Sequence, residues 1–128
     1  MPEMALSDLK VLDFTHGISG PYCTKLLGDY GADVIKIERP GSGDYVRQIG
    51  PFPKDVPHPE KSGTFLHLNT NKRSVTLDLS TESGRDVALK LARQADIVVE
   101  SFRPGVMAGF GLGYQILNGE NSALVVTS

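Results

Sequence analysis

Four short stretches carry side chains that can bind a charged or aromatic ligand, and each follows an apolar segment with strand character. They are residues 16–18, Arg39, the end of the "SVTLDL" segment and residues 101–103. Guanidinium groups commonly bind phosphates, and an aromatic ring beside arginines can stack on an adenine. Because open α/β sheets bind ligands at the carboxyl ends of their strands, the four stretches are expected to form one site.

The turn "HGISGP", residues 16–21, contains Gly and Ser and lies between a predicted strand and a predicted helix. Both features are typical of a turn that holds a catalytic nucleophile or a phosphate. A nucleophile elbow needs G-x-S-x-G, and here the second glycine comes one place too early. The dinucleotide pattern G-x-G-x-x-G also fails, although Glu38 ends the second strand where a ribose-binding acid would sit. Two interpretations stay open: a plain strand-to-helix turn capped by Ser19, or a helix start whose N–H groups favour an anionic ligand.

For the other candidate residues, a structural or solvent-exposed role competes with a functional one. Lys72 and Arg73 lie at the opposite end of their strand from Arg39, so a structural or solvated role is predicted for them. The alternative to a ligand-binding role is a solvated loop position for Arg39 and a core position for Phe102. The three histidines lack ligand spacing, and one cysteine cannot form a zinc cluster, so no metal site is predicted.

Length and charge narrow the class of protein. The 128 residues suit one domain, and a formal net charge of −2 gives no basic field for nucleic acid. Aliphatic runs such as "ALVV" are too short for a bilayer, and the amino terminus lacks a signal-peptide pattern. A single cysteine, Cys23, fits a reducing compartment. We therefore expect a cytoplasmic protein with neither nucleic-acid nor membrane partners.

The hydrophobic pattern alternates between strands and helices and predicts an α/β fold with a mostly parallel sheet and flanking helices. Residues 39–63 interrupt it with a long Pro/Gly-rich loop, functional or disordered. The chain ends on an inner-type strand without a covering helix, so it is expected to be truncated after the fifth strand, as part of a longer protein. Strands are predicted over 10–15, 33–38, 74–79, 96–101 and 123–128, and helices over 19–31, 64–69, 81–94 and 106–117.

Helical spacing also predicts which side chains are buried. In the first helix the spacing selects Cys23, Leu26, Leu27 and Tyr30 as the inward face. In the helix over 81–94 it selects Val87, Ala88, Leu91 and Ala95, with Glu82 in the first turn and Arg93 in the last.

Three longer segments resemble the class III CoA-transferases, the formyl-CoA-transferase-like family. They are "LSDLKVLDFTHGISGPYCTKLLGDYGADVIKIERPGSGD", "LNTNKRSVTLDLSTESGR" and "ADIVVESFRPGVMAGFGLGY", which together cover the chain from Leu6 onward. The resemblance implies a Rossmann-like large domain, of which residues 1–128 are the amino-terminal part that binds CoA or acyl-CoA. The implied CoA contacts are His16, Gly17, Ile18, Arg39, Leu77, Asp78, Leu79, Ser80, Ser101, Phe102 and Arg103.

The resemblance also implies an enzyme that transfers CoA between carboxylic acids through an aspartyl intermediate, working as an interlocked homodimer. The family's nucleophilic aspartate would lie beyond Ser128, and no aspartate of this chain matches its motif, so these 128 residues are predicted to be inactive alone. Relatives usually have Asn where this chain has Ser101, and some have Gln where it has Ile18, which leaves the acyl specificity open.

Two alternatives remain at this point. An acyl-CoA racemase of the α-methylacyl type shares this region and uses acid and base groups further along. A non-catalytic nucleotide-binding or interaction module is the alternative from another class.

Overall fold

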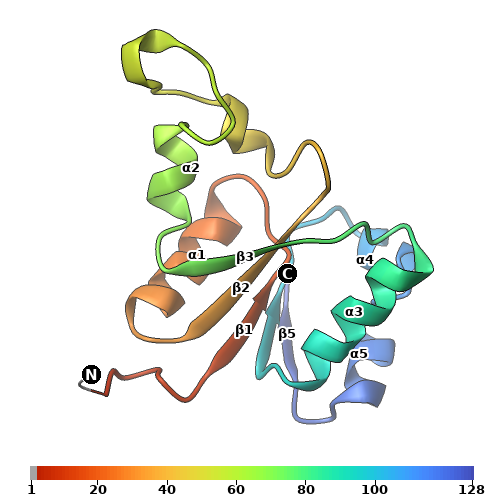
Figure 1. The fold of residues 1–128 in the computed structure, drawn as a ribbon. Coiled ribbons are helices and arrows are strands. Elements are labelled where there is room, and N and C mark those ends of the chain that lie inside the picture. The colour runs from red at the N-terminus through yellow and green to blue at the C-terminus, as the bar shows by residue number, and fades with distance from the viewer. Residues whose placement is uncertain (1–2) are drawn as a thin grey trace.

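A five-stranded sheet lies at the centre of the computed structural model, which describes residues 3–128. All four neighbouring strand pairs are parallel, and the order is β3-β2-β1-β4-β5 (Figure 1). The first strand is therefore the central one, and the predicted α/β, Rossmann-like architecture is confirmed. The strands are β1 (Lys10–Asp13), β2 (Asp33–Glu38), β3 (Lys72–Thr76), β4 (Ile97–Val99) and β5 (Val125–Thr127).

Helices connect the strands and lie on both sides of the sheet, α1 and α2 on one side and α3 and α5 on the other (Figure 1). None of the helices within residues 3–128 is long and apolar enough to cross a membrane. Their bounds are α1 (Ser19–Asp29), α2 (Gly63–Leu68), α3 (Glu82–Arg93), α4 (Val106–Gly109) and α5 (Tyr114–Glu120), with the 3₁₀ helices η1 (Tyr45–Gln48) and η2 (Pro53–Asp55).

Alternate residues of the central strand face two apolar layers, as the pleat of a strand requires. Leu12 packs in the larger cluster with Ala88 and Ala92 of α3. Val11 points the other way, into a smaller cluster that includes Leu27 of α1. The central strands are thus buried on both faces, as strands of parallel sheets generally are, whereas β3 and β5 at the edges are more exposed.

Helix α1 is rotated relative to the prediction. Its buried residues are Pro21, Thr24 and Gly28, whereas Cys23, Leu26 and Tyr30 of the predicted inward face are exposed. The cause is polar: the Thr24 hydroxyl donates to the buried Asp13 carboxylate at 2.7 Å, which turns the small residues of the helix toward the sheet.

The start of α1 also differs from the prediction. Ile18 is the N-cap residue and no side chain caps the helix, so the predicted cap by Ser19 is wrong. Ser19 is instead the first helical residue. At the other end, Gly31 follows the helix with φ +108°, a conformation that suits glycine.

In α3 the predicted termini are confirmed, but one buried position is not. The Thr81 hydroxyl accepts a hydrogen bond from the Gly84 N–H at 3.0 Å and caps the helix, which has Glu82 in its first turn. Val87 is exposed, while Ala88 and the unpredicted Ala92 are fully buried. The helix lies close to its neighbours through alanines, so the larger valine is turned outward.

The segment 39–63 is only partly irregular, because it contains η1 and η2 and is fixed to the sheet by buried groups. Asp44 and Ser62 are both fully buried, and the Ser62 hydroxyl donates to the Val46 carbonyl at 2.8 Å. The predicted helix over 106–117 is also divided, into α4 and α5. Gly111, with φ +74°, lies at the break.

Candidate ligand-binding pocket

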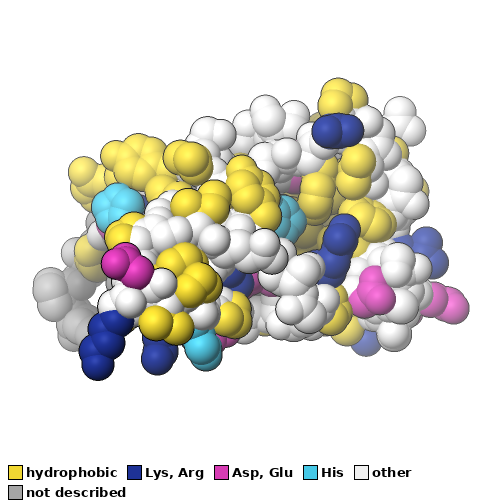
Figure 2. Space-filling model, turned by 90° about the horizontal axis from the view of Figure 1, so that it is seen from above, with side chains coloured by type: hydrophobic (Ala, Val, Ile, Leu, Met, Phe, Trp, Pro, Cys, Tyr) yellow, Lys and Arg dark blue, Asp and Glu magenta, His cyan; other side chains and the backbone are white. Residues whose placement is uncertain are grey.

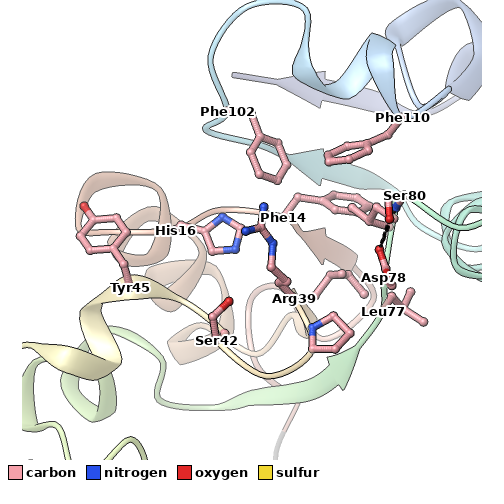
Figure 3. Close-up of a pocket in the computed structure, with 14 residues that line it drawn as sticks. Phe14, His16, Arg39, Ser42, Tyr45, Leu77, Asp78, Ser80, Phe102 and Phe110 are labelled. Carbon is pink, nitrogen blue, oxygen red and sulfur yellow. Dashed lines mark hydrogen bonds between the residues drawn. The ribbon is translucent and has the colours of Figure 1, made fainter.

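A cavity of about 580 Å³ opens at the carboxyl edge of the sheet. Figure 2 looks onto this edge, where hydrophobic side chains gather beside a histidine and basic side chains around a hollow. Segments that follow β1, β2, β3 and β4 all contribute to its wall, as the position of open α/β binding sites predicts. The lining residues are Phe14, His16, Ile37, Arg39, Pro40, Ser42, Gly43, Tyr45, Leu77, Asp78, Leu79, Ser80, Phe102 and Phe110 (Figure 3).

Seven of the eleven residues singled out from the sequence lie in this wall: His16, Arg39, Leu77, Asp78, Leu79, Ser80 and Phe102. The other four do not line it. Gly17 is buried behind the wall, Ile18 and Arg103 are exposed beside it, and Ser101 supports His16 from the end of β4.

Arg39 is the cation of the pocket. It follows β2 directly, and no salt bridge joins it to another residue in the stretch 3–128 that the structure describes. Figure 3 shows its side chain reaching into the space between His16 and Asp78. An unpaired guanidinium in a pocket with apolar walls favours an anionic group of a ligand.

Asp78 is an ionised hydrogen-bond acceptor on the opposite part of the wall. The Ser80 hydroxyl and N–H both donate to its Oδ1, at 2.5 and 3.0 Å. These bonds hold the pKa of Asp78 below its usual range, and the charge of Arg39 acts in the same direction. Both bonds use one carboxylate oxygen, so Oδ2 is left to accept from a ligand hydroxyl.

His16 is held in place by its backbone and by an aromatic neighbour. The backbone N–H of His16 donates to the Ser101 hydroxyl at 3.1 Å, and the centre of its ring lies 5.3 Å from the centre of the Phe102 ring. Burial lowers the pKa of His16; Asp44 opposes this shift, and Lys36 adds to it. The imidazole is therefore neutral at pH 7, and the pocket carries one positive charge, on Arg39, in this region.

Two backbone N–H groups of the first turn, those of His16 and Gly17, are already used inside the protein. The Gly17 N–H donates to Asp44 Oδ1 at 3.1 Å, as the His16 N–H does to Ser101. These two groups are thus not free for a phosphate; both precede α1, so the interpretation that the N–H groups of the helix start favour an anion is untouched by these two bonds.

The aromatic part of the wall was only partly visible in the sequence. Phe102 and Phe110 meet edge to face at 5.9 Å, and Phe14 is fully buried beneath the pocket. Phe110 belongs to a glycine-rich segment of weak periodicity and Tyr45 to the Pro/Gly-rich loop, so no pattern marked either as a site residue. Phe14 did carry a signal, since it continues the apolar alternation of β1 to the edge where ligands bind.

A buried network of charges fixes the loop wall to β2. Lys36 Nζ lies 2.7 Å from Asp44 Oδ2 and also donates to the Thr15 carbonyl at 3.1 Å. Glu38 accepts from Arg47 through both carboxylate oxygens, at 2.7 and 2.8 Å, and from the Asp44 N–H at 2.8 Å. In the sequence, this network is indicated by the charged residues Lys36 and Glu38 at alternate positions of the otherwise apolar strand "DVIKIE".

Lys72 and Arg73, which the sequence places just before the third strand, are the first two residues of β3, and both have the structural or solvated roles that were predicted. Lys72 Nζ lies 3.0 Å from the buried Asp13 carboxylate and donates to the Asn69 side chain at 2.8 Å. Arg73 forms an exposed ion pair with Asp33. No cluster of residues able to hold a metal ion occurs in the described part of the chain.

The parallel sheet and its strand order define a Rossmann-like domain with a pocket at the carboxyl edge of the sheet. Residues 6–128 match the family model described as CoA-transferase family III, and the chain belongs to this family.

Its similarity to known proteins extends over nearly the whole chain. It is 48% identical over 124 residues to succinyl-CoA:mesaconate CoA-transferase from Haloarcula hispanica, and 46% identical over 125 residues to formyl-CoA:oxalate CoA-transferase from Afipia carboxidovorans. Both alignments cover 97% of this chain, but only 31% and 28% of the respective relative. The chain therefore spans about a third of the length of these relatives.

Solved structures also resemble the chain over nearly its whole length. A protein from Mycobacterium tuberculosis, Rv3272, superposes with a TM-score of 0.87 at 43% identity. A CAIB/BAIF family protein from Brucella suis gives a TM-score of 0.87 at 35% identity. Each match covers 98% of this chain and 33% of the solved chain.

Proposed function

We propose that this chain carries the CoA-binding region of a CoA-transferase, which moves CoA between carboxylic acids. The observation that carries the proposal is the unpaired Arg39 in a pocket with an aromatic wall, in a chain whose relatives are named for acyl-CoA reactions. Those names favour a transferase over a racemase. The proposed site is the same set of strand ends at which the sequence predicts a site.

Along the cavity, the order of the pocket residues matches the order of the chemical groups in CoA. Phe102 and Phe110 offer aromatic surface to the adenine, and Asp78 Oδ2 offers an acceptor to a ribose hydroxyl. Arg39 offers a bidentate donor to a phosphate. Of the four predicted contacts that do not line the cavity, the exposed Ile18 and Arg103 are proposed to contact the ligand from beside the pocket, and Gly17 and Ser101 are proposed to hold the turn and His16 in place.

The proposed transfer uses an aspartate carboxylate as nucleophile. It attacks the acyl-CoA carbonyl, the CoA thiolate leaves, and an acyl-aspartyl anhydride forms. The thiolate then attacks the aspartyl carbonyl, which releases the first acid and leaves an aspartyl-CoA thioester. Covalent catalysis of this kind divides one difficult exchange into easier steps. We place this aspartate outside the 128 residues, because none here matches the family motif.

Assembly and location follow from the same proposal. Exposed apolar side chains on α1 and α2, among them Tyr22, Leu26 and Leu66, suit a surface that the rest of an interlocked homodimer covers. The chain has one cysteine, exposed Cys23, and a cytoplasmic location is proposed on that basis.

Replacing Arg39 tests the proposal directly. We expect the wild-type chain to bind CoA in a calorimetric titration, and Arg39→Ala to weaken binding by roughly 10- to 100-fold, the usual cost of losing a charge-assisted hydrogen bond. Dephospho-CoA shows which phosphate is involved, because the effect of Arg39→Ala shrinks with it if Arg39 binds the ribose phosphate.

Arg73→Ala is the matched control, since Arg73 is exposed and lies near the amino end of β3, at the opposite end of the strand from the pocket. This variant is expected to bind CoA as the wild type does. Absence of CoA binding by a chain that circular dichroism shows to be folded would remove the proposal.

A further inference from the structure

Tyr45 is a pocket residue to which neither the family resemblance nor the sequence pattern gives a role. It begins η1, directly after the fully buried Asp44 and before the fully buried Val46. The Asp44 carboxylate accepts from the Val46 N–H at 3.1 Å and pairs with Lys36. The backbone of Tyr45 is thus fixed on both sides, although 59% of the residue is exposed.

The ring of Tyr45 lies over the turn that follows β1. A Cβ atom added to Gly17 would overlap the Tyr45 hydroxyl and lie 3.1 Å from its ring carbon Cζ. Gly17 has φ +87°, which only glycine adopts readily, so its lack of a side chain serves both the turn and the ring. The aromatic ring therefore has a defined place at the wall, unlike an ordinary exposed loop side chain.

Tyr45 lies at the opposite end of the pocket from the residues suited to a nucleotide. In Figure 3, Tyr45 lies on one side of His16 and Arg39, while Asp78, Ser80 and Phe110 lie on the other. In this view the cavity presents, in order, Phe110 with Asp78 and Ser80, then Arg39 and then Tyr45 (Figure 3).

CoA has the same linear order of chemical groups: adenine, ribose and phosphates, then a neutral pantetheine arm that ends in the thiol. With the adenine beside Phe102 and Phe110 and a phosphate on Arg39, the arm leaves the cavity past Tyr45. A tyrosine ring has an apolar body and a polar tip, which suits the methyl groups and amides of that arm.

We infer that Tyr45 is a specificity-determining residue that contacts the pantetheine arm, and that it favours complete CoA over the nucleotide alone. This inference rests on the proposed function. It makes a prediction that the proposed function does not make: the loss on replacing Tyr45 depends on whether the ligand has the arm.

The test compares CoA with adenosine 3′,5′-bisphosphate, the nucleotide part without the arm, by calorimetric titration of the 128-residue chain. We expect Tyr45→Ala to weaken CoA binding about tenfold, which is the size of one aromatic contact in a binding site. Binding of the bisphosphate is expected to stay within about twofold of the wild type. Because the same variant is titrated with both ligands, retained nucleotide binding also shows that the pocket is intact.

Two further variants sharpen the test. Tyr45→Phe keeps the ring and is expected to bind CoA within about threefold of the wild type. Tyr30→Ala is the matched control, because Tyr30 is 61% exposed and ends α1 outside the pocket, and it is expected to bind both ligands as the wild type does.

The outcomes separate the two proposals. Equal losses for CoA and the bisphosphate, or no loss for either, would overturn the role of Tyr45 while leaving the CoA site in place. A loss with Tyr45→Phe as large as with Tyr45→Ala would overturn the ring contact. Failure of the folded wild-type chain to bind CoA would instead remove the proposed function, and the inference with it.

Discussion

The charge of His16 depends on folding, because burial in the folded chain lowers its pKa. Its ring lies beside Phe102, and the charged groups that act on it are Asp44, Lys36, Asp13 and Glu38. Burial outweighs the attraction of the carboxylates and lowers the pKa of His16. A neutral imidazole adds no further positive charge beside the exposed Arg39 and the buried Lys36.

The lowered pKa predicts a pH dependence of stability. The unfolded chain takes up a proton on His16 near the ordinary histidine value of about 6.5, whereas the folded chain does so only at lower pH. The stability contributed by neutral His16 is therefore complete above about pH 6.5 and is lost as the pH falls below it.

Urea unfolding of the wild type and His16→Gln at about pH 7.5 and about pH 5.5 measures this effect. We expect the wild type to lose more stability than the variant over that interval. All other titratable groups are present in both chains, so their contributions cancel. Equal losses in the two chains would contradict the prediction.

At the scale of elements, the segment 39–63 forms a pocket wall because β2 fixes it at two points. Lys36 and Glu38, two residues apart on the same strand, bind Asp44 and Arg47 of the segment. The Arg47 guanidinium also lies 3.7 Å from the centre of the Phe65 ring, so α2 supports the same anchor. These contacts explain how a proline-rich segment holds Tyr45 in one place.

Breaking this anchor is predicted to cost far more than breaking a surface ion pair. Asp44→Ala leaves Lys36 buried without its partner, and we expect a loss of about 3–5 kcal/mol in the free energy of unfolding. Asp33→Ala breaks the exposed pair with Arg73 and is expected to change stability little. Denaturant unfolding measures both.

A second substitution tests the cause. Adding Lys36→Met to Asp44→Ala removes the unpaired charge and is expected to recover part of the lost stability. Equal effects of Asp44→Ala and Asp33→Ala would show that the buried pair is not an anchor.

Local pattern was enough to predict the strands and the edge at which the pocket lies, because apolar segments and turns are local signals. It was not enough to orient α1, where one hydrogen bond from Thr24 to Asp13 outweighs the apolar spacing of Leu26 and Tyr30. Nor could it find Tyr45 or Phe110, which reach the pocket from segments without periodicity. Contacts between residues far apart in sequence, such as Gly17 with Asp44, have no signature in the pattern of one chain.

At the scale of the whole molecule, binding and chemistry are predicted to be separable. We expect the 128-residue chain to bind CoA but not to transfer it from succinyl-CoA to mesaconate or from formyl-CoA to oxalate. The pocket carboxylate, Asp78, is engaged by Ser80, and the proposed nucleophile is placed elsewhere. Chromatographic analysis of the acyl-CoA products measures transfer, with the full-length Haloarcula hispanica relative as the positive control.

Turnover by the wild-type chain would contradict this prediction. Asp78→Asn would then show whether the pocket carboxylate is the nucleophile, because a variant that still binds CoA but has lost turnover would separate catalysis by Asp78 from its proposed role in binding.

The central position of β1 has a consequence for the order in which the molecule can be completed during synthesis. β1 finds its first neighbour in β2, from residue 33 onward, but its second neighbour, β4, begins only at Ile97. A chain made from its amino terminus can therefore assemble β1, β2 and β3 while the other edge of β1 is still open. Phe102 and Phe110 are made last among the pocket residues, so the nascent chain has Arg39 and Tyr45 in place before these two rings.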